Sequence, residues 1–394
     1  QKIFITSGDH DLTENIIHLV LARTTDAPKG TKGISLFLVP KFEVSDDGVV
    51  GSRNGVSTNS IESKMGIKGS PTCVLNFENS KGIMIGPENK GLNSMFTMMN
   101  LERIVVGVQG LGIAETAYQN AVAYSKERKQ GKANNSKNGE TDLIIKHADI
   151  RRSLMNMKSI IEGQRSFAFW LSQQIDVSLS HDDKDVRGDA SNMVALLTPV
   201  IKSFFTDNGV EITNDAIQVF GGYGYTKDQG IEQLFRDNRI TPIYEGTNSV
   251  QAIDLVYRKI SSEGIFENFI KSMDNEIKNY KNEKNLESFL NIFEKYREIL
   301  VSFTKWMREK INSNKDDASA ACNDYLKVLG YTALAFAWIK TLKISFEKQN
   351  SNKEFYEDKI NTGKYYFEKI LPRAQSHYVV GTSGSHTTMN AKFN

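Results

Sequence analysis

The spacing of apolar and polar residues divides the chain into three regions, the first of which has a strand pattern. Within residues 1–88 the apolar residues come in short or alternating runs at 2–6, 18–22, 34–39 and 72–77. Gly, Pro, Asn and Asp separate these runs, as is typical of antiparallel strands joined by turns. The sequence therefore predicts a small β domain of the barrel or sandwich type at 1–88.

The second region, residues 89–262, has a helical pattern. Met95, Met99, Val106 and Ile113 fall four to seven residues apart, as on one face of a helix. Further apolar stripes of this kind follow at 148–175, 189–220 and 249–260. We predict an antiparallel helical bundle for this region.

The third region, residues 265–394, is also helical in pattern, and we predict an accessory helical domain there. The polar segment that begins at Gly381 is predicted to be frayed. The fold class is therefore α+β. Because the chain opens at Gln1 directly in a strand pattern, we expect the β domain to be truncated at its N-terminus and the chain to be part of a longer protein.

Composition narrows the class of protein. A chain of 394 residues is long enough for two or three domains. With 49 basic and 47 acidic residues, no whole-chain field favours nucleic acid or an anionic membrane, and no apolar run is long enough for a membrane span. Cys73 and Cys322 lie far apart, which favours a reducing cytoplasm, and the histidines have no metal-ligand spacing.

Residues 217–251 carry the strongest local signal. Gly221 and Gly222 end a helical stripe, and backbone amides can approach a ligand closely there because glycine has no Cβ. Thr247 or Asn248 can cap the next helix, whose free N-terminal amides suit a phosphate. A Gly-rich turn followed by a capping sequence accounts for the same residues without any ligand.

Glu245 lies immediately before that cap. Its neighbours Ile243 and Tyr244 predict semi-apolar surroundings. Burial disfavours the charged form of a carboxylate, which suits a general base that works near neutral pH. Glu245 is therefore the candidate base.

These segments resemble the acyl-CoA dehydrogenase family. The stretches that are similar to its C-terminal signature are 218–225, 236–239 and 243–247. Residues 3–6 resemble its flavin-facing strand, and residues 64–72 resemble the second signature of its β domain. Residues 101–104 and 124–128 resemble its first bundle helix. The matches occur in the family's order over residues 1–260.

The resemblance implies an FAD-dependent enzyme that converts an acyl-CoA into a trans-2-enoyl-CoA. In that family a glutamate at the position of Glu245 takes the α-proton, and the β-hydride goes to flavin N5. By the same resemblance the residues that contact FAD are Phe4, Thr6, Arg128, Gln218, Gly221, Gly222 and Thr247. Those that contact the acyl-CoA are Asn100, Arg103 and Gly246. An electron-transfer flavoprotein as acceptor and a homodimer are also implied.

Residues 265–394 resemble the extension of large bacterial members of the family, which include the 3-methylmercaptopropionyl-CoA dehydrogenases. Two other interpretations stay open: a DNA- or partner-binding flavoprotein without turnover, and a non-catalytic remnant. The retained Glu245 argues against the first, and the 20 basic and 16 acidic residues of 265–394 are too dispersed to predict a nucleic-acid face.

Three candidates also have a purely structural interpretation. Arg128 lies in a charge run that is typical of a solvated helix face. Arg103 follows a Met-rich segment (Met95, Met98 and Met99) and suits the closing of a core, in which the methionines serve packing. His10 suits a loop, where it would satisfy backbone groups rather than act in catalysis.

Overall fold

The computed structural model describes residues 1–134 and 141–393 and divides the chain into two compact units, Gln1–Glu102 and Arg103–Asn394. Among the described residues, no helix combines the length and the apolar character needed to cross a membrane. The α+β fold class is confirmed, with strands in the first unit and helices dominating the second.

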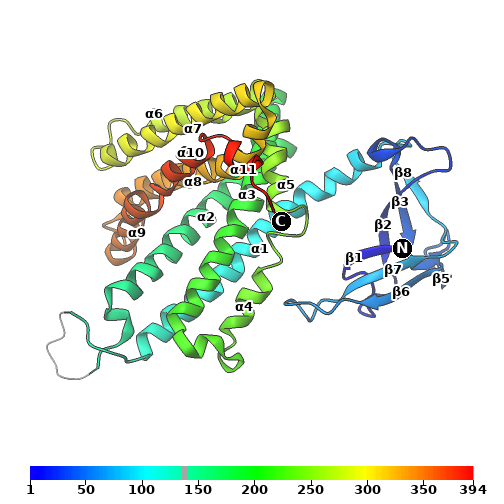
Figure 1. The fold of residues 1–394 in the computed structure, drawn as a ribbon, viewed down its shortest axis with the longest axis horizontal. Helices are drawn as coiled ribbons and strands as arrows, with labels where there is room; N and C mark the ends of the chain where they lie inside the picture. The colour runs from blue at the N-terminus through cyan, green and yellow to red at the C-terminus, as the bar shows by residue number, and fades with distance from the viewer. Residues whose placement is uncertain (135–140, 394) are drawn as a thin grey trace. The chain divides into compact units, whose positions relative to one another are not determined.

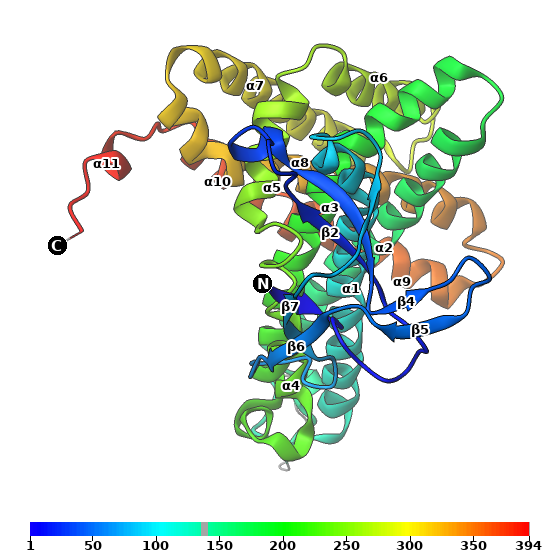
Figure 2. The same ribbon diagram turned by 90° about the vertical axis from the view of Figure 1, so that its right-hand side faces the viewer.

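The first unit contains three small antiparallel sheets, in the orders β1-β7-β6, β2-β3-β8 and β4-β5. The strands are β1 (Lys2–Thr6), β2 (Ile17–Ala22), β3 (Ser35–Pro40), β4 (Phe42–Val44), β5 (Val50–Arg53), β6 (Val56–Ile61), β7 (Thr72–Phe77) and β8 (Ile83–Ile85). Figure 2 shows β4 and β5 as a hairpin. Within the described residues none of the sheets closes into a barrel.

The four predicted strands are confirmed as β1, β2, β3 and β7. β7 is the middle strand of its sheet and buries Cys73, Val74 and Leu75, which accounts for its continuous apolar run. The sequence did not reveal β4, β5, β6 and β8. β5 is exposed along its whole length, and exposed strands lack the apolar alternation on which the prediction rests.

The second unit is helical. Its long helices are α1 (Gly91–Glu127, which begins in the first unit), α2 (Ala148–Ser180), α3 (Lys184–Phe220), α7 (Glu287–Ser313) and α8 (Lys315–Lys348). The shorter ones are α4 (Ile231–Asn238), α5 (Asn248–Asp254), α6 (Ile265–Lys278), α9 (Lys353–Tyr365), α10 (Arg373–Gly381) and α11 (His386–Met389). Two π-helical turns, Leu255–Ile260 and Tyr366–Ile370, continue α5 and α9.

Glycines let the bundle helices approach closely. α2 and α3 lie side by side (Figure 1). On α1, a Cβ added at Gly107 would lie 2.6 Å from the carbonyl oxygen of Ile201, and one at Gly110 would lie 3.2 Å from Cα of Thr206. Both neighbours belong to α3. The absence of a side chain at these two positions therefore sets the distance between α1 and α3.

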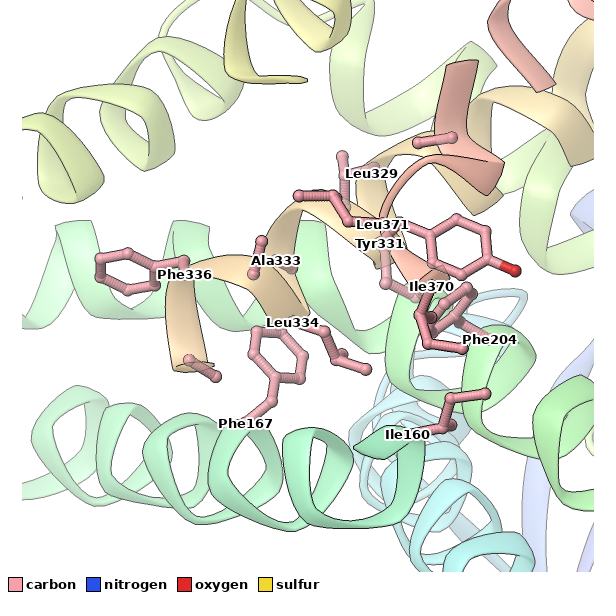
Figure 3. Packing of buried hydrophobic residues seen from close by; sticks show 14 of the residues in the cluster. Ile160, Phe167, Phe204, Leu329, Tyr331, Ala333, Leu334, Phe336, Ile370 and Leu371 are labelled. Carbon is pink, nitrogen blue, oxygen red and sulfur yellow. The ribbon is translucent and has the colours of Figure 1, made fainter. Parts of the chain in front are cut away.

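α8 packs against α2 and α3 (Figure 3). Tyr331 of α8 makes an edge contact with Phe204 of α3, with 4.8 Å between ring centroids. Nε1 of the buried Trp338 donates a hydrogen bond to the carbonyl oxygen of Ser159 in α2, at 3.1 Å. One cluster of buried apolar residues extends from Ile104 to Ala374, so the helices beyond residue 265 share a core with the bundle.

The prediction of a frayed segment from Gly381 is wrong as far as Ser385. α10 ends at Gly381, and Ser385 is buried. Its backbone N–H and its hydroxyl both donate to Oδ1 of Asp317, at 2.8 and 2.7 Å. The polar composition of this segment therefore reflects its hydrogen bonds to α8 rather than exposure to solvent.

Candidate active site

Glu245 lies in the turn that joins α4 to α5. Of the two predicted cap residues, Thr247 and Asn248, the cap is Thr247, because its side-chain oxygen accepts a hydrogen bond from the N–H of Val250, at 3.3 Å. The N–H of Asn248 donates to the carbonyl oxygen of Pro242 at 3.0 Å, which closes the turn. Local sequence therefore fixes where α5 begins and places Glu245 two residues before its cap.

The turn is conformationally strained at the candidate base. Glu245 has φ 55° and Gly246 has φ 85°, so two consecutive residues are left-handed. This region is unfavourable for a residue with a Cβ and is often found at functional sites. Gly246 also faces a crowded space, since an added Cβ would lie 2.8 Å from Nε2 of Gln251.

Side chains from two helices hold the backbone of this turn. The carbonyl oxygen of Glu245 accepts hydrogen bonds from Nε of Arg103 on α1, at 3.4 Å, and from Nε2 of Gln251 on α5, at 3.1 Å. The hydroxyl of Tyr244 donates to the side chain of Gln109, also on α1. Arg103 is buried, and this burial lowers the pKa of its guanidinium, although attraction to Asp254 and Glu245 opposes the effect.

The semi-apolar surroundings predicted for Glu245 are incomplete, because two cationic side chains interact with it. One is Arg103 and the other is Lys202 of α3, whose side chain is fully buried. Burial lowers the pKa of Lys202 to about 8, and attraction to Asp207 and Glu245 opposes this shift. Lys202 could not be recognised from the sequence, because a single lysine in a helical stripe carries no signal of burial.

A second group of candidate residues lines a cavity of about 480 Å³. It brings together Arg128, Gln218, Gly221 and Gly222, four of the residues that the resemblance assigns to FAD. α3 ends at Phe220 as predicted, with Gly221 at a positive φ of 61°. A Cβ added at either glycine would meet nothing within 4 Å, so the space in front of both is open to a ligand.

Arg128 is exposed, and its guanidinium carbon lies 5.6 Å from the centroid of the Tyr223 ring. Tyr124 and Phe220 stack with their ring centroids 4.2 Å apart beside the same cavity. The cavity thus combines a cation, open glycine backbone and aromatic faces, which together suit a phosphate joined to a planar ring system.

The other candidates lie in the first unit. Thr6 ends β1, opposite Thr72. Phe4, in the same strand, has φ 57° and an exposed ring, and Asn100 is an exposed residue of α1. The roles assigned to these residues therefore stay predictions.

The loop interpretation of His10 is confirmed, since its Nδ1 accepts a hydrogen bond from the N–H of Leu12 at 3.2 Å. No cluster of three or more His, Cys, Asp or Glu suited to a metal ion occurs within residues 1–134 and 141–393. Cys73 and Cys322 are buried free thiols.

Comparison with protein families gives two consecutive matches. The family model described as the C-terminal domain of acyl-CoA dehydrogenase matches residues 89–260, and the one described as acetyl-CoA dehydrogenase C-terminal-like matches residues 269–392. The chain belongs to the acyl-CoA dehydrogenase family. The first match contains Glu245 together with Arg103, Arg128 and the paired glycines.

Curated relatives agree with this family. The chain is 44% identical over 263 residues to the 3-methylmercaptopropionyl-CoA dehydrogenase of Ruegeria pomeroyi, an overlap of 67% of this chain and 45% of that protein. It is 34% identical over 387 residues to a butyryl-CoA dehydrogenase of Syntrophomonas wolfei, an overlap of 94% of this chain and 63% of the relative. The chain thus spans less than two thirds of the length of each.

Solved structures share the fold. Caenorhabditis elegans ACDH-11 in complex with C11-CoA superposes with a TM-score of 0.72 at 23% identity, over 96% of this chain and 61% of that one. An acyl-CoA dehydrogenase complexed with FAD from Bacillus anthracis gives a TM-score of 0.71 at 19% identity, over 95% and 62%. Both superpositions include the helices beyond residue 265.

Proposed function

We propose that the protein to which this chain belongs is an FAD-dependent acyl-CoA dehydrogenase with Glu245 as its catalytic base. The Glu245 carboxylate removes a proton from Cα of the thioester, and a hydride leaves Cβ, so that a trans-2-enoyl-CoA forms. FAD, when bound, supplies the hydride acceptor. The family membership and the held, left-handed conformation of Glu245 together support this proposal.

The geometry of the Glu245 turn suits general-base catalysis. Abstraction of a weakly acidic α-proton requires a base that is held in one orientation. The hydrogen bonds from Arg103 and Gln251 to the Glu245 carbonyl fix the backbone from which the carboxylate projects. Glu245 is half-buried, so the residue is partly shielded from water without being closed off from a substrate.

The residues that line the cavity beside Arg128 support its assignment to FAD. The open backbone at Gly221 and Gly222 would accept a phosphate or ribose at short range, because no side chain occupies that space. The Arg128 guanidinium would make charge-assisted hydrogen bonds to a pyrophosphate. Gln218 lines the same cavity and would contact the adenosine part of FAD. In the same proposal Phe4 and Thr6 contact the flavin ring of FAD, and Thr247 contacts its phosphates.

The remaining assignments belong to the same proposal. Arg103, Asn100 and Gly246 contact the acyl-CoA, an electron-transfer flavoprotein accepts the electrons, and two copies of the protein associate. The buried free thiols of Cys73 and Cys322 support a cytoplasmic location. The relatives named for 3-methylmercaptopropionyl-CoA and butyryl-CoA indicate the substrates to try first.

The test uses the full-length protein loaded with FAD. Under anaerobic conditions, mixing with butyryl-CoA or 3-methylmercaptopropionyl-CoA should bleach the visible absorbance of the flavin. Glu245→Gln keeps the size of the side chain but cannot accept a proton, so the rate of bleaching should fall by at least the ~10²–10⁴-fold typical of general-base catalysis. Bleaching at the wild-type rate in this variant would show that another group takes the proton.

A matched control separates the loss of the base from damage to the turn. Glu232→Gln makes the same substitution on α4, at a half-buried carboxylate that pairs with Arg236. It should leave the bleaching rate unchanged. If no acyl-CoA bleaches the wild-type flavin, the interpretation as a binding flavoprotein without turnover is favoured instead.

A further inference from the structure

Lys202 is a buried cation directly beneath the Glu245 turn. Its side chain on α3 has no exposure to solvent. Nζ donates hydrogen bonds to the carbonyl oxygen of Gly246, at 2.8 Å, and to Oδ1 of Asn248, at 2.9 Å. Across residues 1–134 and 141–393, no carboxylate oxygen lies within 4.0 Å of this nitrogen.

A lysine in this environment is costly to the fold. Desolvation of an ammonium group is unfavourable unless the charge is paired or fully hydrogen-bonded, and here both acceptors are neutral. Asp207 and Glu245 attract the charge from a greater distance, whereas Arg103 repels it. An apolar side chain of similar length would avoid this cost. The hydrogen bonds to residues 246 and 248 are therefore the advantage that a lysine has over an apolar residue at this position.

Asn248 extends the attachment to a second point on α3. Its Nδ2 donates to Oδ1 of Asp207 at 2.7 Å, to Oγ1 of Thr206 at 3.0 Å and to the carbonyl oxygen of Ser203 at 3.2 Å. Its Oδ1 accepts from Lys202. The start of α5 is therefore hydrogen-bonded to one turn of α3.

These contacts complete the support of the two left-handed residues. The carbonyl of Glu245 is held by Arg103 of α1 and Gln251 of α5, and the next carbonyl, that of Gly246, is held by Lys202 of α3. A left-handed glutamate persists only where the surrounding structure fixes it. Lys202 is the only one of these donors that reaches the second peptide of the turn.

We propose that Lys202 is a positioning residue, which acts through the Gly246 carbonyl and Asn248 to hold the Glu245 carboxylate in the orientation required for proton abstraction. This inference rests on the proposed function, in which Glu245 is the base. Lys202 itself does not contact the reacting atoms.

The first experiment compares two lysine-to-methionine variants of the full-length, FAD-loaded protein. Lys202→Met should lower the rate constant of anaerobic flavin reduction at saturating butyryl-CoA by about 10²-fold, the order expected from misplacing a catalytic group by about 1 Å. The Kd for butyryl-CoA should change much less than this rate constant, because Lys202 itself does not contact the substrate in the proposed site. Lys327→Met removes a different lysine, which is half-buried, attracts the Asp207 carboxylate and has no contact to the turn. It should leave the rate unchanged.

The second experiment measures whether Lys202 acts through Glu245. In a Glu245→Gln background, Lys202→Met should lower the residual rate by no more than about threefold, because a residue that only positions the base has nothing left to position. An equal loss in both backgrounds would overturn the proposal in favour of a general structural role. If Glu245→Gln alone retains the wild-type rate, the proposed function fails first, and that result is distinct from a failure of Lys202.

Lys202→Gln provides a second variant in case Lys202→Met does not fold. It removes the charge but keeps an N–H donor, one bond nearer to Cα than the lysine Nζ that donates to the Gly246 carbonyl. Its flavin-reduction rate should lie between those of the wild type and Lys202→Met. If Lys202→Met does not fold, the rate of Lys202→Gln is compared with the wild type alone and should lie well below it. A wild-type rate in either folded Lys202 variant would refute the positioning role.

Discussion

Gly163 of α2 tests how closely the helices beyond residue 265 pack on the bundle. A Cβ added there would lie 2.7 Å from Nε1 and 3.1 Å from Cδ1 of Trp338 on α8, with Leu334 Cδ2 at 3.4 Å. The indole cannot retreat freely, because Nε1 donates to the carbonyl oxygen of Ser159. We expect Gly163→Ala to push α8 away from α2 or to break this hydrogen bond.

The magnitude follows from three opposing effects. Alanine in a helix interior is favoured over glycine by about 1 kcal/mol. Overpacking of a filled core costs about 1–3 kcal/mol, and loss of the indole hydrogen bond costs about 1 kcal/mol more. The net loss in the free energy of unfolding should therefore be about 1–3 kcal/mol, which lowers the melting temperature by about 2–6 °C for a unit of this size.

Gly112 of α1 is the matched control. It also lies inside a long helix, and a Cβ added there meets nothing within 4 Å. Gly112→Ala should therefore raise the free energy of unfolding by up to about 1 kcal/mol. The assay is thermal and urea unfolding followed by far-ultraviolet circular dichroism and tryptophan fluorescence. Equal stabilisation by both substitutions would refute the close contact between α2 and α8.

Two further predictions concern single charged groups. Arg128→Ala should weaken FAD binding by about 1.5–3 kcal/mol through the loss of a charge-assisted phosphate contact. The measurements are the flavin retained after dialysis and the Kd for FAD on reconstitution. An unchanged Kd would mean that Arg128 is only a charge on a solvated helix face. The hydrogen bond from Arg308 lowers the pKa of the Glu267 carboxyl below its usual 4.5, and the stability gained from this pair is present above that value and is lost as the pH falls through the folded-state pKa. The difference in unfolding free energy between wild type and Glu267→Gln should therefore shrink in acid. The measurement runs from about pH 3 to about pH 7, which spans the usual pKa of a glutamate. A difference that is constant over this range would contradict the assignment.

Local chemistry determined much of what the sequence predicted correctly. The runs that became β3 and β7 are apolar because those strands lie in the middle of their sheets and bury most of their side chains, which leaves a pattern along the chain. The end of α3 at Gly221 and the cap at Thr247 were predictable for the same reason, since each depends on one residue type and its nearest neighbours. The exposed β5 leaves no such pattern and was missed.

Tertiary structure alone decided the surroundings of the candidate base. In the sequence, Ile243 and Tyr244 directly precede Glu245, so semi-apolar surroundings were expected. In the fold, Arg103 lies 142 positions away along the chain and Lys202 more than forty, yet Arg103 holds the Glu245 carbonyl and Lys202 the next one. A lone lysine in a helical stripe gives no sign of burial, because its cost and its hydrogen bonds appear only when α3 packs against the turn. The sequence by itself thus determined the family, the helical regions, some of the strands and the identity of the candidate base, whereas the packing of distant helices determined which charges surround that base and what holds it in place.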